Sequence, residues 1–252
     1  MINLTLTRRR FLSRLSQLAI AAGLVPLADH ASAQSGALAS GRDVYDVTAF
    51  GARGDGKAFD TAAINQAITA AAAAGGGTVN FPAGTYLSYS IRLKSNVGLH
   101  LGNGCVLVAA EGNGYDTAES NQPWENYQDY GHSHWHNSLI WGEELEDISI
   151  SGPGRIWGKG LSRGEGPPPQ AETPGIGNKS IALKNCRNVV LRDFSILHGG
   201  HFGILATGVD NLTIDKLDQP RRHGHRLLPQ RPHPVSYTHL DVYKRQRMVC
   251  LR

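Results

Sequence analysis

The alternation of apolar and polar residues predicts one amphipathic helix followed by a series of short strands. Apolar residues recur at the spacing of one helix face, at Ile64, Ala67, Ile68 and Ala71. Asp60 or Thr61 can cap this helix, and the glycines at 75–77 end it. The next run, 78–81, alternates and predicts a strand, and Pro82 marks the turn after it.

Further predicted strands each begin with Asn or Asp ahead of alternating apolar residues. They start at Asn96, Asp147, Asn188 and Asn211. The last two start 23 residues apart, which matches one coil of a β-solenoid, whereas the earlier intervals of 51 and 41 residues predict about two coils each with loops added. Inward Val, Ile and Leu side chains would stack from coil to coil, and the asparagines would bond the backbone of the turns.

Two stretches lack this alternation, 111–136 and 161–177, and predict loops that project from the scaffold. The first is rich in aromatic residues. Because aromatic faces stack on sugar rings, Trp124 and Trp135 are candidate substrate contacts. The alternative is that these rings pack the loop onto its scaffold.

The elements from residue 46 to residue 86 follow one another in an order that resembles a known family. They read DVTAFGARGDGKAFDTAAINQAITAAAAAGGGTVNFPAGTY. This order of FGA, GDG, D-T-x-A-I-N-x-A-I, GGG-T-V and F-P-A-G-x-Y resembles the N-terminal cap of the pectinase-type β-helices, and is most similar to glycoside hydrolase family 28, the polygalacturonases. The resemblance implies an all-β fold, a right-handed parallel β-helix whose N-terminal helix closes the open end of the solenoid.

The family hydrolyses α-galacturonide bonds of pectin with inversion, using two separated carboxylates, so the resemblance implies this activity and a pectic polysaccharide partner. Its motifs N-T-D, D-D, G-H-G and R-I-K are missing from this reading frame, and no catalytic residue is assigned. Where many members carry N-S-P-x-W, this chain has HGGHF at 198–202, which makes His201 a candidate substrate contact. Its alternative role is to bond a neighbouring backbone group. The alternative functions are a β-helix that binds polysaccharide without cleaving it and a pectate lyase or epimerase.

The N-terminal segment has the features of an export signal. Arg8 and Arg9 match the twin-arginine pattern, an apolar stretch follows at 18–27, and Ala33 ends a small-residue cleavage site. The apolar stretch is too short for a permanent anchor. Residues 1–33 are therefore predicted to be a twin-arginine signal peptide, with a general secretory signal as the alternative, and the mature protein to be periplasmic or secreted.

The C-terminal segment departs from the β-helix pattern after Asp218. Residues 234–246 read PVSYTHLDVYKRQ, which resembles a translated transposon end of the kind used as a sequencing adapter. The preceding residues, from 219, can be encoded by DNA that in the next frame gives RDGMDIDCCRNVRI and continues the solenoid. We therefore expect residues 34–218 to be the N-terminal part of a truncated β-helix, and 219–252 to be a frameshifted, artefactual tail that does not pack. The alternative for the first part of the tail is a genuine basic loop.

Net charge changes along the chain. Residues 34–218 carry 13 Lys and Arg against 19 Asp and Glu, so this region has a net charge of −6, although the whole chain has +4. That sign argues against a nucleic-acid partner. His132, His134 and His136 would bind a metal only if the loop brought them together, so we expect no metal. We also expect no cofactor and a monomer.

Overall fold

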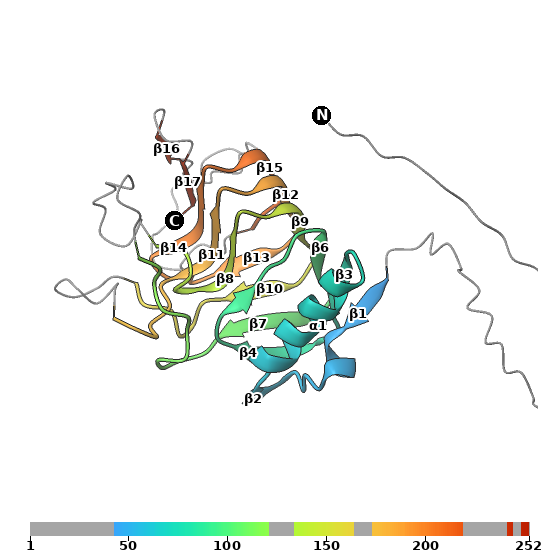
Figure 1. The fold of residues 1–252 in the computed structure, drawn as a ribbon. Helices are drawn as coiled ribbons and strands as arrows, with labels where there is room; N and C mark the ends of the chain where they lie inside the picture. Colours follow the sequence, from blue (N-terminus) through green and yellow to red (C-terminus); the bar gives the residue numbers. More distant parts are fainter. Residues whose placement is uncertain (1–42, 121–133, 164–172, 219–240, 244–247, 252) are drawn as a thin grey trace, which may run out of the picture. The chain divides into compact units, whose positions relative to one another are not determined.

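The computed structural model describes residues 43–120, 134–163 and 173–218, and the backbone of 241–243 and 248–251 (Figure 1). All of them belong to the unit Ala39–Arg252. In this part of the chain, no helix is long and apolar enough to cross a lipid bilayer. The predicted export residues Arg8, Arg9 and Ala33 lie outside the described residues.

The strands form three sheets, which the chain visits in turn. Sheet 1 contains β1 (Val44–Asp46), β3 (Gly77–Phe81), β6 (Val97–Leu101), β9 (Glu146–Ser151), β12 (Arg187–Arg192) and β15 (Asp210–Asp215). Sheet 2 contains β2 (Asp55–Phe59), β4 (Gly84–Ser88), β7 (Cys105–Ala109), β10 (Arg155–Trp157) and β13 (Ser195–Leu197). Sheet 3 contains β5 (Ile91–Arg92), β8 (Ser138–Glu143), β11 (Lys179–Lys184), β14 (Phe202–Thr207), β17 (Met248–Leu251) and β16 (Asp241–Tyr243). All pairs from β1 to β15 are parallel, so the predicted parallel β-helix is confirmed.

The number of coils differs from the sequence prediction. β6 pairs directly with β9, and β9 with β12, so the intervals of 51 and 41 residues each hold one coil instead of two. The extra residues lie mainly in the turns from sheet 2 to sheet 3, between β7 and β8 and between β10 and β11. The corresponding turn between β13 and β14 is short. A spacing alone could not separate a second coil from a long loop.

Left-handed backbone recurs at three equivalent corners of successive coils. The positive φ angles fall at Glu144, Asn185 and Gly208, at Asp147, Asn188 and Asn211, and at Gly152, Asp193 and Lys216. The middle set forms a ladder in which Asn188 Nδ2 donates to Asp147 Oδ1 (2.9 Å) and Asn211 Nδ2 donates to Asn188 Oδ1 (3.0 Å). The asparagines therefore join coil to coil, instead of bonding turn backbones as predicted. Asn and Asp suit these corners because their short side chains tolerate the left-handed region.

The exposed Glu144 is the least suited residue at its corner, with φ of 56°, where the third coil has Gly208. Glu144→Gly should raise the free energy of unfolding by about 0.5–1 kcal/mol, because relief of left-handed strain outweighs the added chain entropy of glycine. Urea denaturation of both variants would measure this. Glu144→Ala is the matched control, since it removes the carboxylate but keeps the strain. Equal gains from the two variants would contradict the strain argument.

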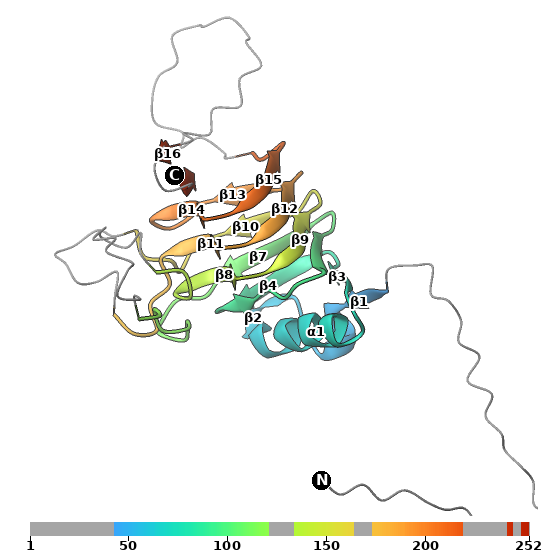
Figure 2. The same cartoon turned by 45° about the horizontal axis from the view of Figure 1, so that its top comes forward.

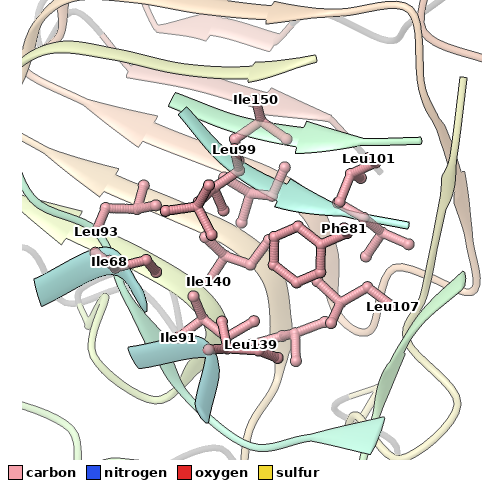
Figure 3. Close-up of a cluster of buried hydrophobic side chains, with 14 of the residues drawn as sticks. Ile68, Phe81, Ile91, Leu93, Leu99, Leu101, Leu107, Leu139, Ile140 and Ile150 are labelled. Atoms are coloured by element: carbon pink, nitrogen blue, oxygen red, sulfur yellow. The ribbon is translucent and has the colours of Figure 1, made fainter. Parts of the chain in front are cut away.

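The core lies between the sheets and under the N-terminal helix. The stacked apolar residues come from all three sheets and from α1 (Thr61–Ala73), and include Ile68, Phe81, Leu99, Leu107, Ile140 and Ile150 (Figure 3). The predicted helix face is confirmed, since Ile64, Ala67, Ile68 and Ala71 are all fully buried. α1 contacts β1, β3 and β5, at the first coil (Figure 2). The helix thus covers apolar side chains of that coil, as predicted for a cap.

Asp60 has a different role from the predicted one. It occupies the position before α1, but its side chain makes no capping hydrogen bond to the helix. The buried carboxylate instead accepts the backbone N–H groups of Arg53 (2.7 Å) and Gly54 (3.2 Å). It therefore fixes the glycine loop between η1 (Val47–Phe50) and α1.

The segment after residue 218 also departs from its prediction in one place. β17 pairs antiparallel with β14, and β16 pairs with β17. The expectation that 219–252 does not pack is therefore wrong for 248–251. The physical reason is that the last parallel strand of a stack leaves N–H and C=O groups open to any available strand.

Candidate functional site

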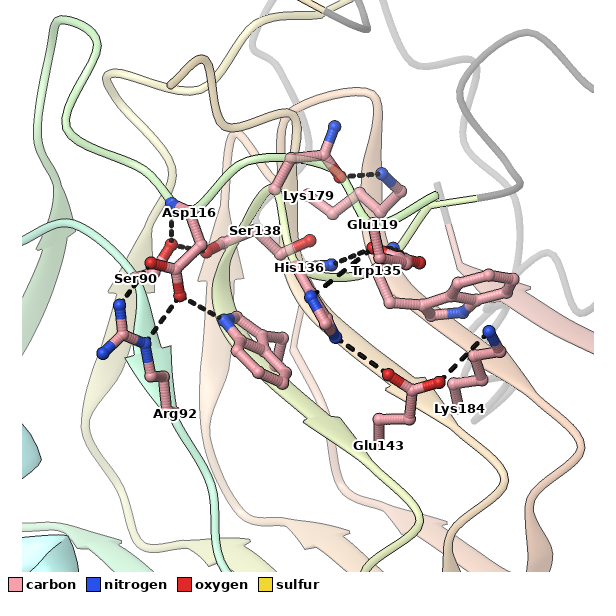
Figure 4. Close-up of polar contacts among 12 residues, drawn as sticks. Ser90, Arg92, Asp116, Glu119, Trp135, His136, Ser138, Glu143, Lys179 and Lys184 are labelled. Carbon is pink, nitrogen blue, oxygen red and sulfur yellow. Dashed lines mark hydrogen bonds and ion pairs between the residues drawn. The ribbon is translucent and has the colours of Figure 1, made fainter. Parts of the chain in front are cut away.

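A polar cluster covers the outer face of sheet 3. On this face, Glu143, Lys184 and Thr207 share one row across β8, β11 and β14, and Trp141 pairs with Arg92 in the neighbouring row. The segments before β8 lie over these rows (Figure 4). We define the sheet-3 cluster as Arg92, Asp116, Glu119, Trp135, His136, Trp141, Glu143 and Lys184.

Asp116 anchors one side of the cluster. Its carboxylate accepts from Arg92 Nε (2.8 Å), Arg92 Nη2 (2.5 Å) and Trp141 Nε1 (2.8 Å), while its backbone N–H donates to Ser90 Oγ (2.9 Å). Burial alone would raise the pKa of Asp116, but the hydrogen bonds from Arg92 and Trp141 and the charge of Arg92 hold that pKa below its ordinary value. The loop that enters from β7 is therefore attached to β5 and β8 by an ionised carboxylate.

Asp116→Asn should lower the free energy of unfolding by about 1.5–3 kcal/mol at neutral pH, because it removes a charged acceptor from two donors. Since the folded pKa of Asp116 is depressed, this stabilisation is present above the unfolded value near 3.8 and is lost as the pH falls below it. The difference between the two proteins should therefore shrink in acid. Denaturant unfolding at several pH values would test this, and a constant difference would contradict it.

The other side of the cluster is a chain of charged groups. Glu119 accepts the backbone N–H groups of Trp135 (2.8 Å) and His136 (3.0 Å). The His136 ring lies between carboxylates, with Nε2 2.9 Å from Glu143 Oε2 and Nδ1 3.9 Å from Glu119 Oε2. Lys184 Nζ lies 3.1 Å from Glu143 Oε1. The same His136 ring stacks on Trp141 at a centroid distance of 3.9 Å, so the two sides of the cluster are connected.

Trp135 lies over the sheet. It is 1% exposed and packs with Ala182, Phe202 and Leu205, and Lys184 Nζ lies 4.6 Å from the centroid of its ring. Among the described residues, neither Trp135 Nε1 nor Thr207 Oγ1 has a hydrogen-bond partner, although both atoms are buried. A buried donor without an acceptor is costly, so these two atoms reduce the stability that is gained by packing the indole on the sheet.

Lys179 adds a second buried ammonium in sheet 3. Its side chain is fully buried, and Nζ donates to Asn137 Oδ1 (3.2 Å) and to Asn178 Oδ1. Asn137 and Asn178 immediately precede β8 and β11. Lys179 therefore ties together the ends of the two long loops where they enter the sheet.

The predicted substrate contacts fall in different surroundings. The burial of Trp135 favours the packing alternative for that residue, and Trp124 lies outside the described residues. His201 is partly exposed, and its Nδ1 lies 3.2 Å from the backbone oxygen of Arg163, which agrees with the backbone-bonding alternative. Substrate contact by Trp124, Trp135 and His201 stays a prediction.

Of the three histidines proposed as metal ligands, the structure describes His134 and His136. His132 lies outside the described residues, and His136 bonds Glu143. Within the described ranges, no group of three or more His, Cys, Asp or Glu side chains is arranged to hold a metal ion.

Most of the sheet-3 cluster could not be predicted from the sequence. Asp116 and Glu119 lie in a non-periodic loop, so no spacing pointed to them. Glu143 and Lys184 could have been found, because they are 41 residues apart, the same interval as Asp147 and Asn188 on the neighbouring sheet. Opposite charges at that interval indicate a cross-strand pair between adjacent coils.

Comparison with known proteins places this fold. A family model described as rhamnogalacturonase A/epimerase, pectate lyase-like, matches residues 44–141. The mannuronan C5-epimerase AlgE5 of Azotobacter vinelandii is 67% identical over 42 residues, which are 17% of this chain and 4% of that enzyme. Among solved structures, the family 28 exopolygalacturonase of Yersinia enterocolitica is 22% identical with a TM-score of 0.58, covering 71% of this chain and 39% of that one. The exopolygalacturonase of Thermotoga maritima is 18% identical with a TM-score of 0.55, covering 70% and 46%.

These similarities establish the class of fold. The chain has a pectin lyase-like parallel β-helix fold, with polygalacturonases among its structural neighbours. The chain covers 39% of the Yersinia enterocolitica exopolygalacturonase and 46% of the Thermotoga maritima exopolygalacturonase. The match to the epimerase covers 4% of that enzyme.

Proposed function

We propose that the parent protein is an exported glycoside hydrolase that cleaves α-galacturonide bonds of pectin with inversion, and that this chain carries its N-terminal coils. The observation that carries the proposal is the parallel β-helix with α1 over its first coil, the arrangement that the ordered motifs of residues 46–86 predict. Family 28 exopolygalacturonases are among the structural neighbours of this fold.

The comparisons support a uronic-acid polymer as the substrate class. The family model and the relatives carry the names rhamnogalacturonase, polygalacturonase and mannuronan epimerase. Each of these names refers to a polysaccharide that contains uronic acids. Membership of glycoside hydrolase family 28 is part of the proposal, and rests on the ordered motifs of residues 46–86 together with the shared fold.

The catalytic carboxylates belong, in this proposal, to coils that follow Asp218 in the natural gene. Inverting hydrolysis needs one protonated carboxyl at the leaving oxygen and one ionised carboxylate that activates water on the opposite face. In the described cluster, Asp116 is engaged by Arg92 and Glu143 by Lys184 and His136. These carboxylates therefore position loops, and the chain as written should release no reducing ends.

An epimerase or lyase acting on a uronic-acid polymer is the second candidate. It is favoured by the 67% identity to the mannuronan C5-epimerase over 42 residues, a level that no described similarity to a hydrolase reaches. Both reactions abstract a proton next to a uronate carboxylate, so they need a base and a group that stabilises the resulting anion. A polysaccharide-binding protein without activity is a third candidate.

The test begins with resequencing the natural gene across codons 215–252. We expect an open frame that continues as RDGMDIDCCRNVRI and then encodes D-D and G-H-G motifs; a natural gene that encodes QPRRHGHRLL would contradict the frameshift. The protein from the corrected gene is then incubated with polygalacturonate and with mannuronan. Release of reducing ends without ultraviolet absorbance supports hydrolysis, whereas an unsaturated ultraviolet-absorbing product indicates a lyase. A change in uronate stereochemistry without chain cleavage indicates an epimerase.

A further inference from the structure

A line of apolar side chains crosses the outer face of sheet 2. The strand register places Phe59 beside Leu87, Leu87 beside Val108, Val108 beside Trp157 and Trp157 beside Leu197. We call these five residues the sheet-2 stripe. Their strand neighbours Tyr86, Leu107, Ile156 and Ile196 belong to the core, so the stripe points away from it.

The stripe is partly open to solvent. Phe59 is 59% exposed and Leu87, Trp157 and Leu197 are partly exposed, while Val108 at the centre is 4% exposed. Within the described part of the chain, no stripe residue belongs to either apolar cluster. This differs from the outer face of sheet 3, where Trp135 covers the apolar residues. The fold therefore does not use the stripe to bury its own core.

The dimensions of the stripe fit a narrow, extended ligand. Neighbouring strands lie about 4.8 Å apart, so five positions extend over about 19 Å, with a width of one side chain. A standard protein partner needs about 800 Å² of surface, far more than such a line offers. Aromatic rings lie at two positions, since Phe59 stacks on Tyr89 at 5.0 Å and Trp157 lies next to His198, with Nε1 3.4 Å from Nδ1. Sugar rings stack on aromatic faces of this kind.

A cation adjoins the stripe. Arg155 lies two residues before Trp157 and therefore on the same outer face of β10. Arg155 is exposed, and its Nε donates to Ser195 Oγ at 3.3 Å. In the described ranges it forms no ion pair with a carboxylate, whereas the nearby Lys159 pairs with Glu111 at 3.2 Å. The Arg155 guanidinium is thus available for two parallel hydrogen bonds to a carboxylate.

We infer that the sheet-2 stripe is a second carbohydrate-binding surface, which holds an acidic polysaccharide lengthwise across the coils. Sugar rings contact Trp157 and Phe59, aliphatic side chains fill the line between them, and Arg155 binds a uronate carboxylate. The choice of an acidic polymer rests on the proposed function, but the surface itself lies on a different sheet from the sheet-3 cluster. It would retain the polymer wherever cleavage takes place.

The test is calorimetric titration of the full 252-residue chain with a long oligogalacturonide. Trp157→Ala is expected to weaken binding about tenfold, and Arg155→Gln about fivefold. Arg192→Gln is the matched control, because it removes an exposed arginine from the outer face of sheet 1. It should change the affinity by less than about twofold. Raising the salt concentration should weaken binding of the wild type more than binding of Arg155→Gln.

Several results would overturn the inference. They are equal affinities for the wild type and Trp157→Ala, equal binding of neutral dextran, or no binding by the wild type. A dimer that dissociates when Trp157 is replaced would assign the stripe to self-association instead. The inference and the proposed function can fail independently. If Trp157→Ala loses binding, the inference is supported even when the protein from the corrected gene releases no reducing ends. Unchanged circular dichroism and a cooperative urea transition would show that Trp157→Ala, Arg155→Gln and Arg192→Gln are folded.

Discussion

Trp135→Ala should lower the free energy of unfolding by about 3–5 kcal/mol, the range for large aromatic side chains removed from packed interiors. The indole is 1% exposed, it covers Ala182, Phe202 and Leu205, and it lies over the Lys184 ammonium. Its removal would open a cavity on the outer face of sheet 3 and let water reach Lys184. Chemical denaturation of the purified chain measures the change.

Two variants serve as controls for Trp135. Trp135→Phe keeps a ring over Lys184 and should cost less than about half as much. Trp157→Ala removes the same side chain from the half-open outer face of sheet 2, and should cost less than about 1.5 kcal/mol. A loss at Trp135 no larger than at Trp157 would show that the segment before β8 does not hold the indole in place.

The second large effect concerns the ion pair beneath this ring. Lys184→Met should lower the free energy of unfolding by about 2–3 kcal/mol, because it leaves the Glu143 carboxylate without its ammonium partner in a largely buried site. The expected cost lies below the range for fully buried pairs because Glu143 is 27% exposed and also contacts His136. Methionine retains most of the volume of the lysine side chain.

The double variant Lys184→Met/Glu143→Gln separates the ion pair from packing. If an unpaired charge causes the loss, neutralising Glu143 should recover more than half of it, since the partner no longer needs an ammonium. If the loss comes from packing against Trp135, the double variant should be no more stable than Lys184→Met. Urea midpoints of the wild type, Lys184→Met, Glu143→Gln and the double variant complete this double-mutant cycle.

The sequence predicted those parts of the fold in which apolar residues repeat at a regular spacing and thereby indicate a buried face. Ile64, Ala67, Ile68 and Ala71 recur with the helix period, and they are buried as expected. The Asn and Asp residues correctly indicated the corners of the coils. Their hydrogen-bonded ladder was not predicted, because a sequence does not show which neighbour a side chain contacts. Coil number was overestimated because a long turn and an extra coil give the same interval.

The candidate site was harder to predict for a related reason. Asp116 and Glu119 act through contacts with Arg92 and with the backbone of Trp135 and His136, and none of these pairs shares a period. Trp135 was selected for its aromatic ring, yet the burial of the ring depends on how the loop folds back over sheet 3. Only the pair of Glu143 and Lys184 follows from coil geometry, through its interval of 41 residues.

The extra residues lie mainly in the two turns from sheet 2 to sheet 3, and this has a consequence for how the scaffold can change. One residue added at a left-handed corner would shift the next strand by one position and exchange its inward and outward side chains. Between β7 and β8, or β10 and β11, the strands on both sides are already held in register, and doubling a flexible loop costs only about 0.6 kcal/mol. Transplanted loops that keep Tyr115, Asp116, Trp135 and Leu161 should therefore be accepted there, so recognition can be exchanged between β-helices while the strands keep their register.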